Sequence, residues 1–442
     1  MSIPSGRSGS APQAQGRAAP TPRGGPAAAV VEVETQARAA REAARTLHYA
    51  SDAARRAALE AIAAAIRSRA RAILDANGRD LAALGDRPAA FRDRLTLTPD
   101  RVEDLARALE NIAALPDPVG AAVDVRTRPN GMEVRRVRVP IGVVAMIYES
   151  RPNVTVDAAG LCLRSGNAVI LRGGAESRHS DEALGEAIAA GLRAAGLPEA
   201  SVTLLARRDY DAIRDLVRLE GLVDLVIPRG GPALIRLVTE HARVPVLKHD
   251  RGVTHVFVDR DADVEMAVRL IVNAKTNRPS TCNALEKVLV DSPAAGRIVP
   301  PLVAALRAAG VEVRGDAATR RWAPDVTPAT DDDWDAEYLD LILAIRAVDG
   351  FDAAVEHIRR HGTGLADAIV TRDGARAERF VREVDSAAVL VNASTRLVDG
   401  GEFGLGAEVG ISTSRLHARG PMGLEDLTTT KWIVWGSGQT RT

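Results

Sequence analysis

One cysteine of this chain lies in a polar segment whose composition could support covalent chemistry. Cys282 is part of residues 275–283, KTNRPSTCN, and Pro279 should end the helix that precedes it. Cationic and partly exposed surroundings lower the pKa of a thiol, and Lys275 and Arg278 are near in sequence. The local context supports a nucleophilic thiolate and an ordinary loop cysteine equally.

The second cysteine has the opposite context. Cys162 lies in the apolar run AAGLCL, residues 158–163, which is typical of a buried helix. Two cysteines in such unlike settings argue against a disulfide and fit a reducing cytoplasm. The chain has no CxxC pair, its eight histidines lack ligand spacing, and no GxSxG elbow occurs. We expect neither a metal site nor a serine hydrolase.

Two glycine pairs follow predicted strands and precede predicted helices. They lie in LRGG, residues 171–174, and in IPRGGP, residues 227–232. Glycine lets the backbone approach a phosphate, and the N-terminus of a helix attracts anions. The candidate cofactor-binding residues are Arg172, Gly173, Gly174, Arg229, Gly230 and Gly231. Neither pair matches GxGxxG, so plain turns explain the glycines equally well, and the arginines could simply be solvated.

Composition narrows the class of protein. The 442 residues carry 58 basic and 58 acidic side chains, which argues against nucleic acid or an anionic membrane as a partner. The most apolar run, residues 141–148, is far shorter than the roughly 20 residues of a membrane helix. Residues 1–30 are rich in Gly, Pro, Ser and Ala, which predicts a disordered tail; a transit peptide is the alternative.

The elements that must position these residues change type along the chain. Apolar side chains recur at helical spacing over residues 33–47 and 59–66, and Ser51 and Thr98-Pro99 are typical starts of helices. Alternating residues 123–127 and 132–139 then flank Asn130-Gly131, which predicts a hairpin. The hairpin is rich in arginine, and we expect it to contact another subunit; an exposed flap is the alternative.

From residue 141 onward, short apolar strands alternate with amphipathic helices. This order predicts two α/β domains with parallel sheets. The strand candidates are residues 142–147, 168–171, 202–205, 223–227, 254–258, 287–290, 339–345, 367–371 and 387–391.

Several longer segments together resemble a known family. They are VPIGVV (139–144), YESRPNVT (148–155), GNAVILRGG (166–174), PRGG (228–231), NAKTNRPSTCN (273–283), GGEFGLGAE (400–408) and LHARGPMGL (416–424). From about Ala39 onward the chain resembles the gamma-glutamyl phosphate reductases, or glutamate-5-semialdehyde dehydrogenases, of the aldehyde dehydrogenase superfamily. The chain departs from the family pattern at Asn277, Thr254 and Leu365 and in its tail.

The resemblance implies an activity. These enzymes reduce L-glutamate 5-phosphate with NADPH to the semialdehyde and phosphate, the second step of proline biosynthesis. The resemblance implies that Cys282 is the catalytic cysteine, that Asn153 is a donor of the oxyanion hole, and that Glu337 is the glutamate at the nicotinamide ribose. The glutamate kinase that supplies the substrate is a candidate partner.

The resemblance also bears on the reaction type and the substrate. Hydrolytic relatives carry a glutamate base where this chain has LKHDRGV, residues 247–253, so a reductive reaction is favoured, with Asp250 as an alternative base. Candidates to hold the substrate's anionic groups are Arg151, Arg278, His417 and Arg419, although the last two could belong to a purely structural loop.

By analogy, the domains are expected as follows. An NADPH-binding domain takes residues 31–121, 140–256 and 387–404, a catalytic domain 257–386, and a β extension for homo-oligomers 122–139 and 405–442. The alternatives are another oxidoreductase of the superfamily and a catalytically silent scaffold with the same fold.

Overall fold

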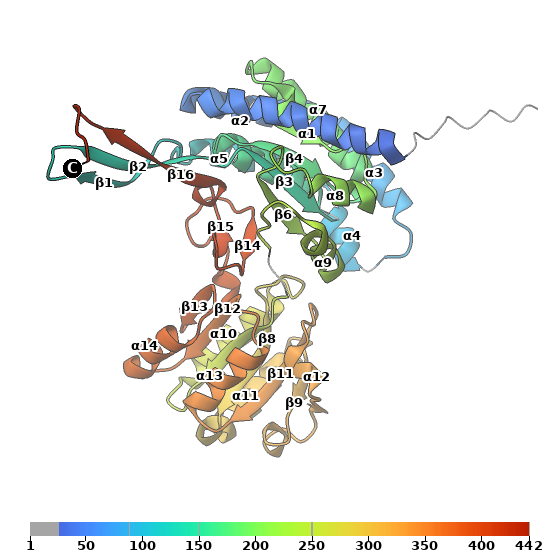
Figure 1. The fold of residues 1–442 in the computed structure, drawn as a ribbon. Coiled ribbons are helices and arrows are strands. Elements are labelled where there is room, and N and C mark those ends of the chain that lie inside the picture. Colours follow the sequence, from blue (N-terminus) through green and yellow to red (C-terminus); the bar gives the residue numbers. More distant parts are fainter. Residues whose placement is uncertain (1–25, 88, 150, 249–250, 442) are drawn as a thin grey trace, which may run out of the picture.

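The computed structural model describes residues 26–87, 89–149, 151–248 and 251–441. Residues 1–25 of the predicted tail and the alternative base Asp250 lie outside these ranges. The described chain forms two α/β units and a three-stranded arm (Figure 1). None of its helices combines the length and the apolar character needed to span a bilayer.

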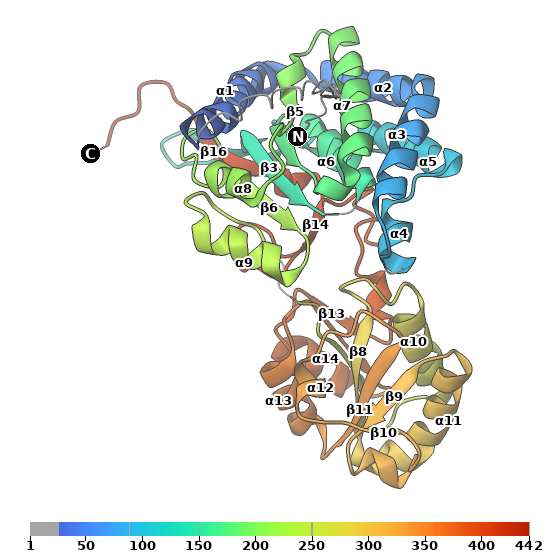
Figure 2. The ribbon, with the colours of Figure 1, turned by 90° about the vertical axis from the view of Figure 1, so that its right-hand side faces the viewer.

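The first unit is built around a parallel sheet in the order β5-β4-β3-β6. Helices cover this sheet, as Figure 2 shows. Its elements are α1 (Pro26–Tyr49), α2 (Asp52–Ser68), α3 (Ala70–Ala83), α4 (Ala89–Leu95), α5 (Pro99–Ala114), β3 (Val143–Tyr148), α6 (Pro152–Arg164), β4 (Ala168–Arg172), α7 (Arg178–Ala194), β5 (Val202–Leu204), α8 (Tyr210–Leu216), β6 (Leu225–Arg229) and α9 (Pro232–His241).

Local sequence explains why these helices form where they do. Ser51 accepts a hydrogen bond from the N–H of Ala54 at 3.2 Å, which confirms the predicted cap of α2. The apolar stripe of α2 is fully buried. Close packing on α7 needs a glycine, since a Cβ on Gly191 would lie 2.6 Å from the backbone of Ile62. Residues 26–30, which the sequence placed in the tail, belong to α1, which begins at Pro26.

The second unit contains a parallel sheet in the order β10-β9-β11-β8-β7-β12-β13. Its elements are β7 (Thr254–Val258), α10 (Val264–Thr276), β8 (Leu285–Asp291), α11 (Ala295–Ala308), β9 (Glu312–Gly315), β10 (Thr327–Pro328), α12 (Asp332–Asp335), β11 (Ile342–Val348), α13 (Phe351–His361), β12 (Ala366–Val370), α14 (Gly374–Glu383) and β13 (Ala388–Val391).

Two predictions about this unit are corrected. β13 pairs with β12, as Ala366 does with Ala388, so residues 388–391 belong to the second sheet and not to the expected NADPH-binding domain. β11 starts at Ile342 and not at residue 339, because Leu339 has a φ of 53°, which no strand adopts. The predicted pair of α/β domains with parallel sheets is otherwise confirmed.

The arm is an antiparallel sheet of β1 (Ala122–Thr127), β2 (Glu133–Pro140) and β16 (Thr428–Trp435). The predicted hairpin is confirmed, and the C-terminal strand β16 adds to it. The arm projects from the first unit in Figure 1 and exposes the apolar side chains Val123, Val125, Trp432 and Val434. A small antiparallel pair, β14 (Gly410–Ser412) and β15 (Gly420–Met422), completes the fold.

Candidate active site

Cys282 lies on a tight loop between α10 and β8. The loop reverses at Arg278, which has a φ of 58°, and the hydroxyl of Thr281 donates to the carbonyl of Arg278 at 2.9 Å. The next residue anchors the loop, since the amide of Asn283 donates to the carbonyl of Val398 at 2.8 Å. Cys282 itself is half-buried. The sequence thus presents a partly accessible thiol at the N-terminal end of β8.

The segment that precedes β7 packs directly on this cysteine. A Cβ on Gly252 would lie 2.0 Å from the carbonyl oxygen of Cys282, so only glycine fits. The N–H of Gly252 donates to Glu337 Oε1 at 2.8 Å. Gly252 therefore lies beside the cysteine, and Glu337 is bound to the same residue.

Burial and nearby charges have opposing effects on the Cys282 thiol. Burial raises the pKa of the Cys282 thiol, Arg229 and Arg151 oppose this, and Glu337 and Glu408 add to it. Lys275 does not serve the thiol, because it is buried in an ion pair with Glu286 at 3.2 Å. The cations near Cys282 in the sequence therefore do not lower its pKa, because burial outweighs them and carboxylates accompany them.

Several arginines gather near the thiol. Burial, together with the positive charges of Arg229, Arg94 and Arg278, lowers the pKa of Arg151 to about 10, whereas Cys282 opposes this shift. Arg396 belongs to the same group, since it donates to Asn283 Oδ1 beside the cysteine; burial lowers its pKa, Arg278 lowers it as well, and Cys282 opposes this. Such a concentration of guanidinium groups fits a ligand with several negative charges.

We call Arg94, Arg151, Arg229, Arg278 and Arg396 the arginine group. Sequence reasoning named Arg151, Arg229 and Arg278 but missed Arg94 on α4 and Arg396 after β13. It also missed Glu408, whose carboxylate accepts a hydrogen bond from the N–H of Gly400 at 2.8 Å. Glu408 is the last residue of the GGEFGLGAE segment, and this segment was the sequence signal that could have identified it. No signal in the sequence pointed to Arg94.

Asn153, the predicted oxyanion donor, is an exposed residue in the first turn of α6. Its amide donates to Asp157 Oδ2 at 3.0 Å. Burial raises the pKa of Asp157 to about 6, although Asn153 and then Arg229 lower it. An amide has two N–H groups, so this bond fixes the side chain and leaves one donor.

Both glycine pairs have structural partners within the chain. A Cβ on Gly173 would lie 2.1 Å from Asp181 Oδ2, and this buried carboxylate pairs with Arg208 at 2.7 Å. The N–H of Gly231 donates to Glu149 Oε2 at 3.0 Å, and a Cβ on Gly230 would lie 2.5 Å from the same oxygen. Close packing therefore accounts for Gly173 and Gly230, and phosphate binding stays a prediction.

The remaining predicted residues lie in other surroundings. Arg172 is buried at the end of β4, donates to the carbonyl of Arg208 at 2.5 Å and lies over the ring of Tyr210. His417 bonds through its ring to the carbonyl of Asp426 at 2.6 Å. Arg419 pairs with Asp385 at 2.7 Å. These contacts do not bring His417 or Arg419 into the arginine group.

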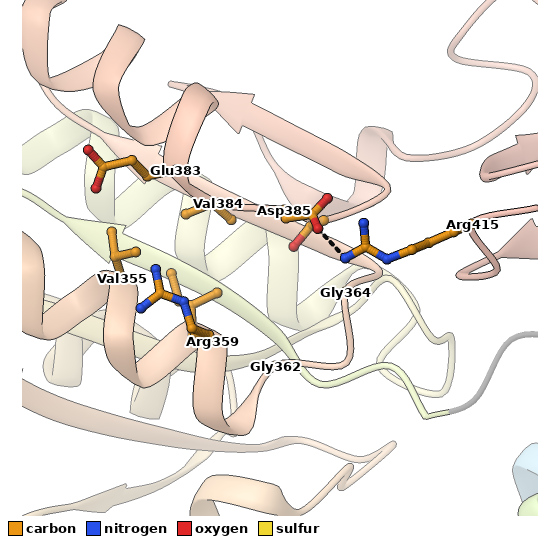
Figure 3. Close-up of a pocket in the computed structure, with 10 residues that line it drawn as sticks. Val355, Arg359, Gly362, Gly364, Glu383, Val384, Asp385 and Arg415 are labelled. Carbon is orange, nitrogen blue, oxygen red and sulfur yellow. Dashed lines mark hydrogen bonds and ion pairs between the residues drawn. The ribbon is translucent and has the colours of Figure 1, made fainter.

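A cavity of about 430 Å³ lies beside that ion pair, in the second unit. Figure 3 shows it between residues of α13 and the segment from the end of α14 to residue 386, with Arg415 bound to Asp385. No residue that lines it belongs to the arginine group or to the cysteine loop. The cavity is therefore not the place of the cysteine chemistry. Within the described ranges, no group of histidine, cysteine and acidic residues could hold a metal ion.

Comparison with known proteins gives a consistent result. The model of the aldehyde dehydrogenase family matches residues 24–341. A gamma-glutamyl phosphate reductase of Xanthomonas campestris pv. campestris (strain 8004) is 54% identical over 403 residues, which cover 91% of this chain and 97% of that protein. One from Xylella fastidiosa is 53% identical over 403 residues, covering 91% of this chain and 95% of that protein.

Solved structures agree. The crystal structure of gamma-glutamyl phosphate reductase from Thermotoga maritima matches with a TM-score of 0.91 and 46% identity, covering 93% of this chain and 100% of that chain. A glyceraldehyde-3-phosphate dehydrogenase from Methanocaldococcus jannaschii, solved in complex with NADP, shares the fold with a TM-score of 0.69 and 15% identity, covering 92% and 95%. This chain belongs to the aldehyde dehydrogenase family and, within it, to the gamma-glutamyl phosphate reductases.

Proposed function

We propose that this enzyme reduces L-glutamate 5-phosphate with NADPH to L-glutamate 5-semialdehyde and inorganic phosphate, as the second step of proline biosynthesis. The observation that carries the proposal is the half-buried Cys282 beside Arg151 and Arg229. The printed name of its relatives supports the substrate. A thiol supplies the nucleophile, and the arginines supply positive charge for an acyl phosphate.

The first step is an exchange at the acyl carbon. The sulfur of Cys282 attacks this carbon, the bond from carbon to the phosphate oxygen breaks, and phosphate leaves with the electron pair. Because the pKa of Cys282 is raised, the thiol is protonated at neutral pH, and the departing phosphate can accept its proton. A thioester on Cys282 results.

Two donors are proposed to stabilise the oxyanion of this step. One is the free N–H of the Asn153 amide, whose other N–H is held by Asp157. The second is the backbone N–H of Cys282, which has no acceptor in the described part of the chain. Preorganised donors of this kind stabilise the transition state because they need no reorientation.

A dinucleotide fits the residues at the strand ends of the first unit. Buried Arg172 has an Nε without a hydrogen-bond partner among the described residues and could bind the 2′-phosphate. Arg229 and the glycines of both pairs would line the path of the pyrophosphate, and Glu337 would meet the nicotinamide ribose. NADPH, when bound there, supplies the hydride that reduces the thioester. Cys282 is then released as the aldehyde forms.

The substrate's anionic groups are assigned to the arginine group. Arg151 and Arg278 are the proposed contacts, and Arg94 and Arg396 add positive charge. His417 and Arg419 stay in the proposal with weaker support, because Arg419 already pairs with Asp385.

The proposal also covers assembly and location. The exposed apolar side chains of the arm, such as Trp432 and Val434, support a homo-oligomer. Two unpaired cysteines support a cytoplasmic location. A glutamate kinase that hands over the labile acyl phosphate is the proposed partner, on chemical grounds alone.

One assay tests the function. The enzyme is incubated with glutamate 5-semialdehyde, NADP and inorganic phosphate, and the appearance of NADPH is followed. Turnover that requires phosphate is expected. Turnover without phosphate would instead indicate another oxidoreductase of the superfamily, and no turnover would indicate a silent scaffold.

A further inference from the structure

The turn formed by residues 336–339 carries Glu337 to the cysteine loop. Glu337 holds the N–H of Gly252, and Gly252 packs against Cys282. The backbone of this turn is strained, because Leu339 has a φ of 53°. A non-glycine residue in this region persists only where its surroundings hold it. The question is what holds this turn.

Two adjacent residues of β8 contact its two ends. Lys287 Nζ donates to the carbonyl of Ala336 at 2.7 Å. Glu286 Oε1 accepts from the N–H of Leu339 at 3.3 Å, and its other oxygen pairs with Lys275. Although adjacent residues of a strand point to opposite faces of the sheet, both of these side chains reach the turn. Side chains of β8 therefore hold the turn at both ends.

A lysine at position 287 lowers the stability of the folded state. Its side chain is fully buried, and within the described residues its amine has no ion pair; it has the Ala336 carbonyl and the ring of Tyr338, whose centroid lies 4.2 Å away. Burial lowers the pKa of Lys287 to about 8, although the charge of Glu286 opposes this. Burying this amine therefore costs stability, and an apolar side chain of similar volume would avoid that cost. A role in the site explains why a lysine is used.

We infer that Lys287 is a positioning residue: its amine fixes the 336–339 turn so that Glu337 holds Gly252 against Cys282. The order of contacts is Lys287 to Ala336, Glu337 to Gly252, and Gly252 to Cys282. A second consequence, that Glu337 is held ready for the nicotinamide ribose, rests on the proposed function.

Hydrogen exchange at the Gly252 amide tests the positioning without any turnover. Lys287→Met removes the amine and keeps most of the volume, and Glu337→Ala removes the acceptor. Each should raise the exchange rate of this amide about 10-fold, the effect of losing one hydrogen bond. The double variant should exchange no faster than either single variant, because both act on one contact. Lys287→Arg keeps a donor and should restore protection.

The control is Arg55→Met, which removes another buried cation, one that pairs with Asp117 in the first unit. It should leave the exchange of Gly252 unchanged even if it lowers the Tm. Should Lys287→Met not fold, Lys287→Gln takes its place, since its amide is too short to reach Ala336. Unchanged protection in the folded Lys287 variant, or effects that add fully in the double variant, would overturn the inference.

A kinetic readout separates this inference from the proposed function. Lys287→Met should raise the KM for NADPH about 10-fold and lower kcat less, since an interaction with the cofactor is loosened. If the wild-type enzyme shows no turnover, the proposed function fails, while the exchange experiment still decides the role of Lys287. If turnover is present and Gly252 stays protected, the positioning role alone fails.

Discussion

The two parallel sheets contribute to the site from opposite ends of their strands. In the first unit, Arg151 and Arg229 lie at the C-terminal ends of β3 and β6, where open α/β sheets usually bind ligands. In the second unit, Gly252 and Cys282 lie just before the N-terminal ends of β7 and β8. The cations of one unit influence the thiol of the other. The second unit contains the nucleophile together with Arg278 and Arg396, and the first unit adds the positive charges of Arg151 and Arg229.

The two sets of strand ends are also held in place by different kinds of contact. The strand ends of the first unit are closed by internal anions, such as Glu149 at Gly231 and Asp181 beside Gly173. The loops before the second sheet are instead held by side chains of that sheet and its flanks, such as Asn283 and Lys287. We expect substitutions of the nucleophile and of the oxyanion donor to act on kcat, and those of the charged groups around them to act on KM.

The largest effect is expected for the nucleophile. Cys282→Ser should reduce phosphate-dependent turnover about 1,000-fold or more, because the hydroxyl is a far weaker nucleophile. Cys162→Ala is the matched control, since Cys162 is buried in the first unit and burial raises its pKa to about 12. It should keep turnover within about 2-fold and lower the Tm through a small cavity. A fully active Cys282→Ser would remove the basis of the proposal.

The oxyanion donor comes next. Asn153→Ala should reduce kcat about 100- to 1,000-fold with little change in KM, the usual effect of removing one preorganised donor. Steady-state kinetics with the semialdehyde, NADP and phosphate measure it. A loss confined to KM would place Asn153 in substrate binding instead.

A pair of arginines tests the division between binding and chemistry. Arg278→Met should raise the KM for the acyl phosphate about 10- to 100-fold, the range for a charge-assisted hydrogen bond. Arg419→Met should change it less, because Arg419 is paired with Asp385. Equal effects of the two variants would show that the loop of His417 and Arg419 also binds the substrate.

The smallest effect concerns pH. The pKa of Asp157 is raised to about 6, so the carboxylate that holds Asn153 is lost as pH falls through 6, and kcat should decline there. Asp157→Asn should flatten this part of the profile. The effect of pH on stability has the opposite sign. The folded state keeps the Asp157 proton to a higher pH than the unfolded state does. The wild type should therefore lose stability relative to Asp157→Asn as pH rises from 4 to 6. An unchanged profile in the variant would exclude Asp157 as the titrating group.

Local patterns in the sequence predicted much of the fold. Helical spacing, the cap at Ser51 and the Asn130-Gly131 turn depend on neighbouring residues, and each was confirmed. The sheet to which β13 belongs and the short strands β9, β10, β14 and β15 depend on distant partners and were wrong or missed. Short strands carry too few residues for a period to be visible.

The same distinction applies to the site. Cys282 and Gly252 lie in segments that were singled out from the sequence. The electrostatic effects of Arg94 on Arg151 and of Arg396 and Glu408 on Cys282 arise only when segments far apart in the sequence meet. The pKa of the thiol depends on burial as well as on charge, and burial cannot be inferred from the two cations in KTNRPSTCN.

The central claim is that the sulfur of Cys282 carries the acyl group. The most direct measurement is peptide mass spectrometry after the enzyme is incubated with glutamate 5-semialdehyde and NADP in the absence of phosphate and then quenched in acid. The account predicts that the peptide containing Cys282 gains the mass of one glutamyl group, that hydroxylamine removes it, and that added phosphate prevents its accumulation. An unmodified Cys282 peptide from enzyme that has produced NADPH would contradict the account.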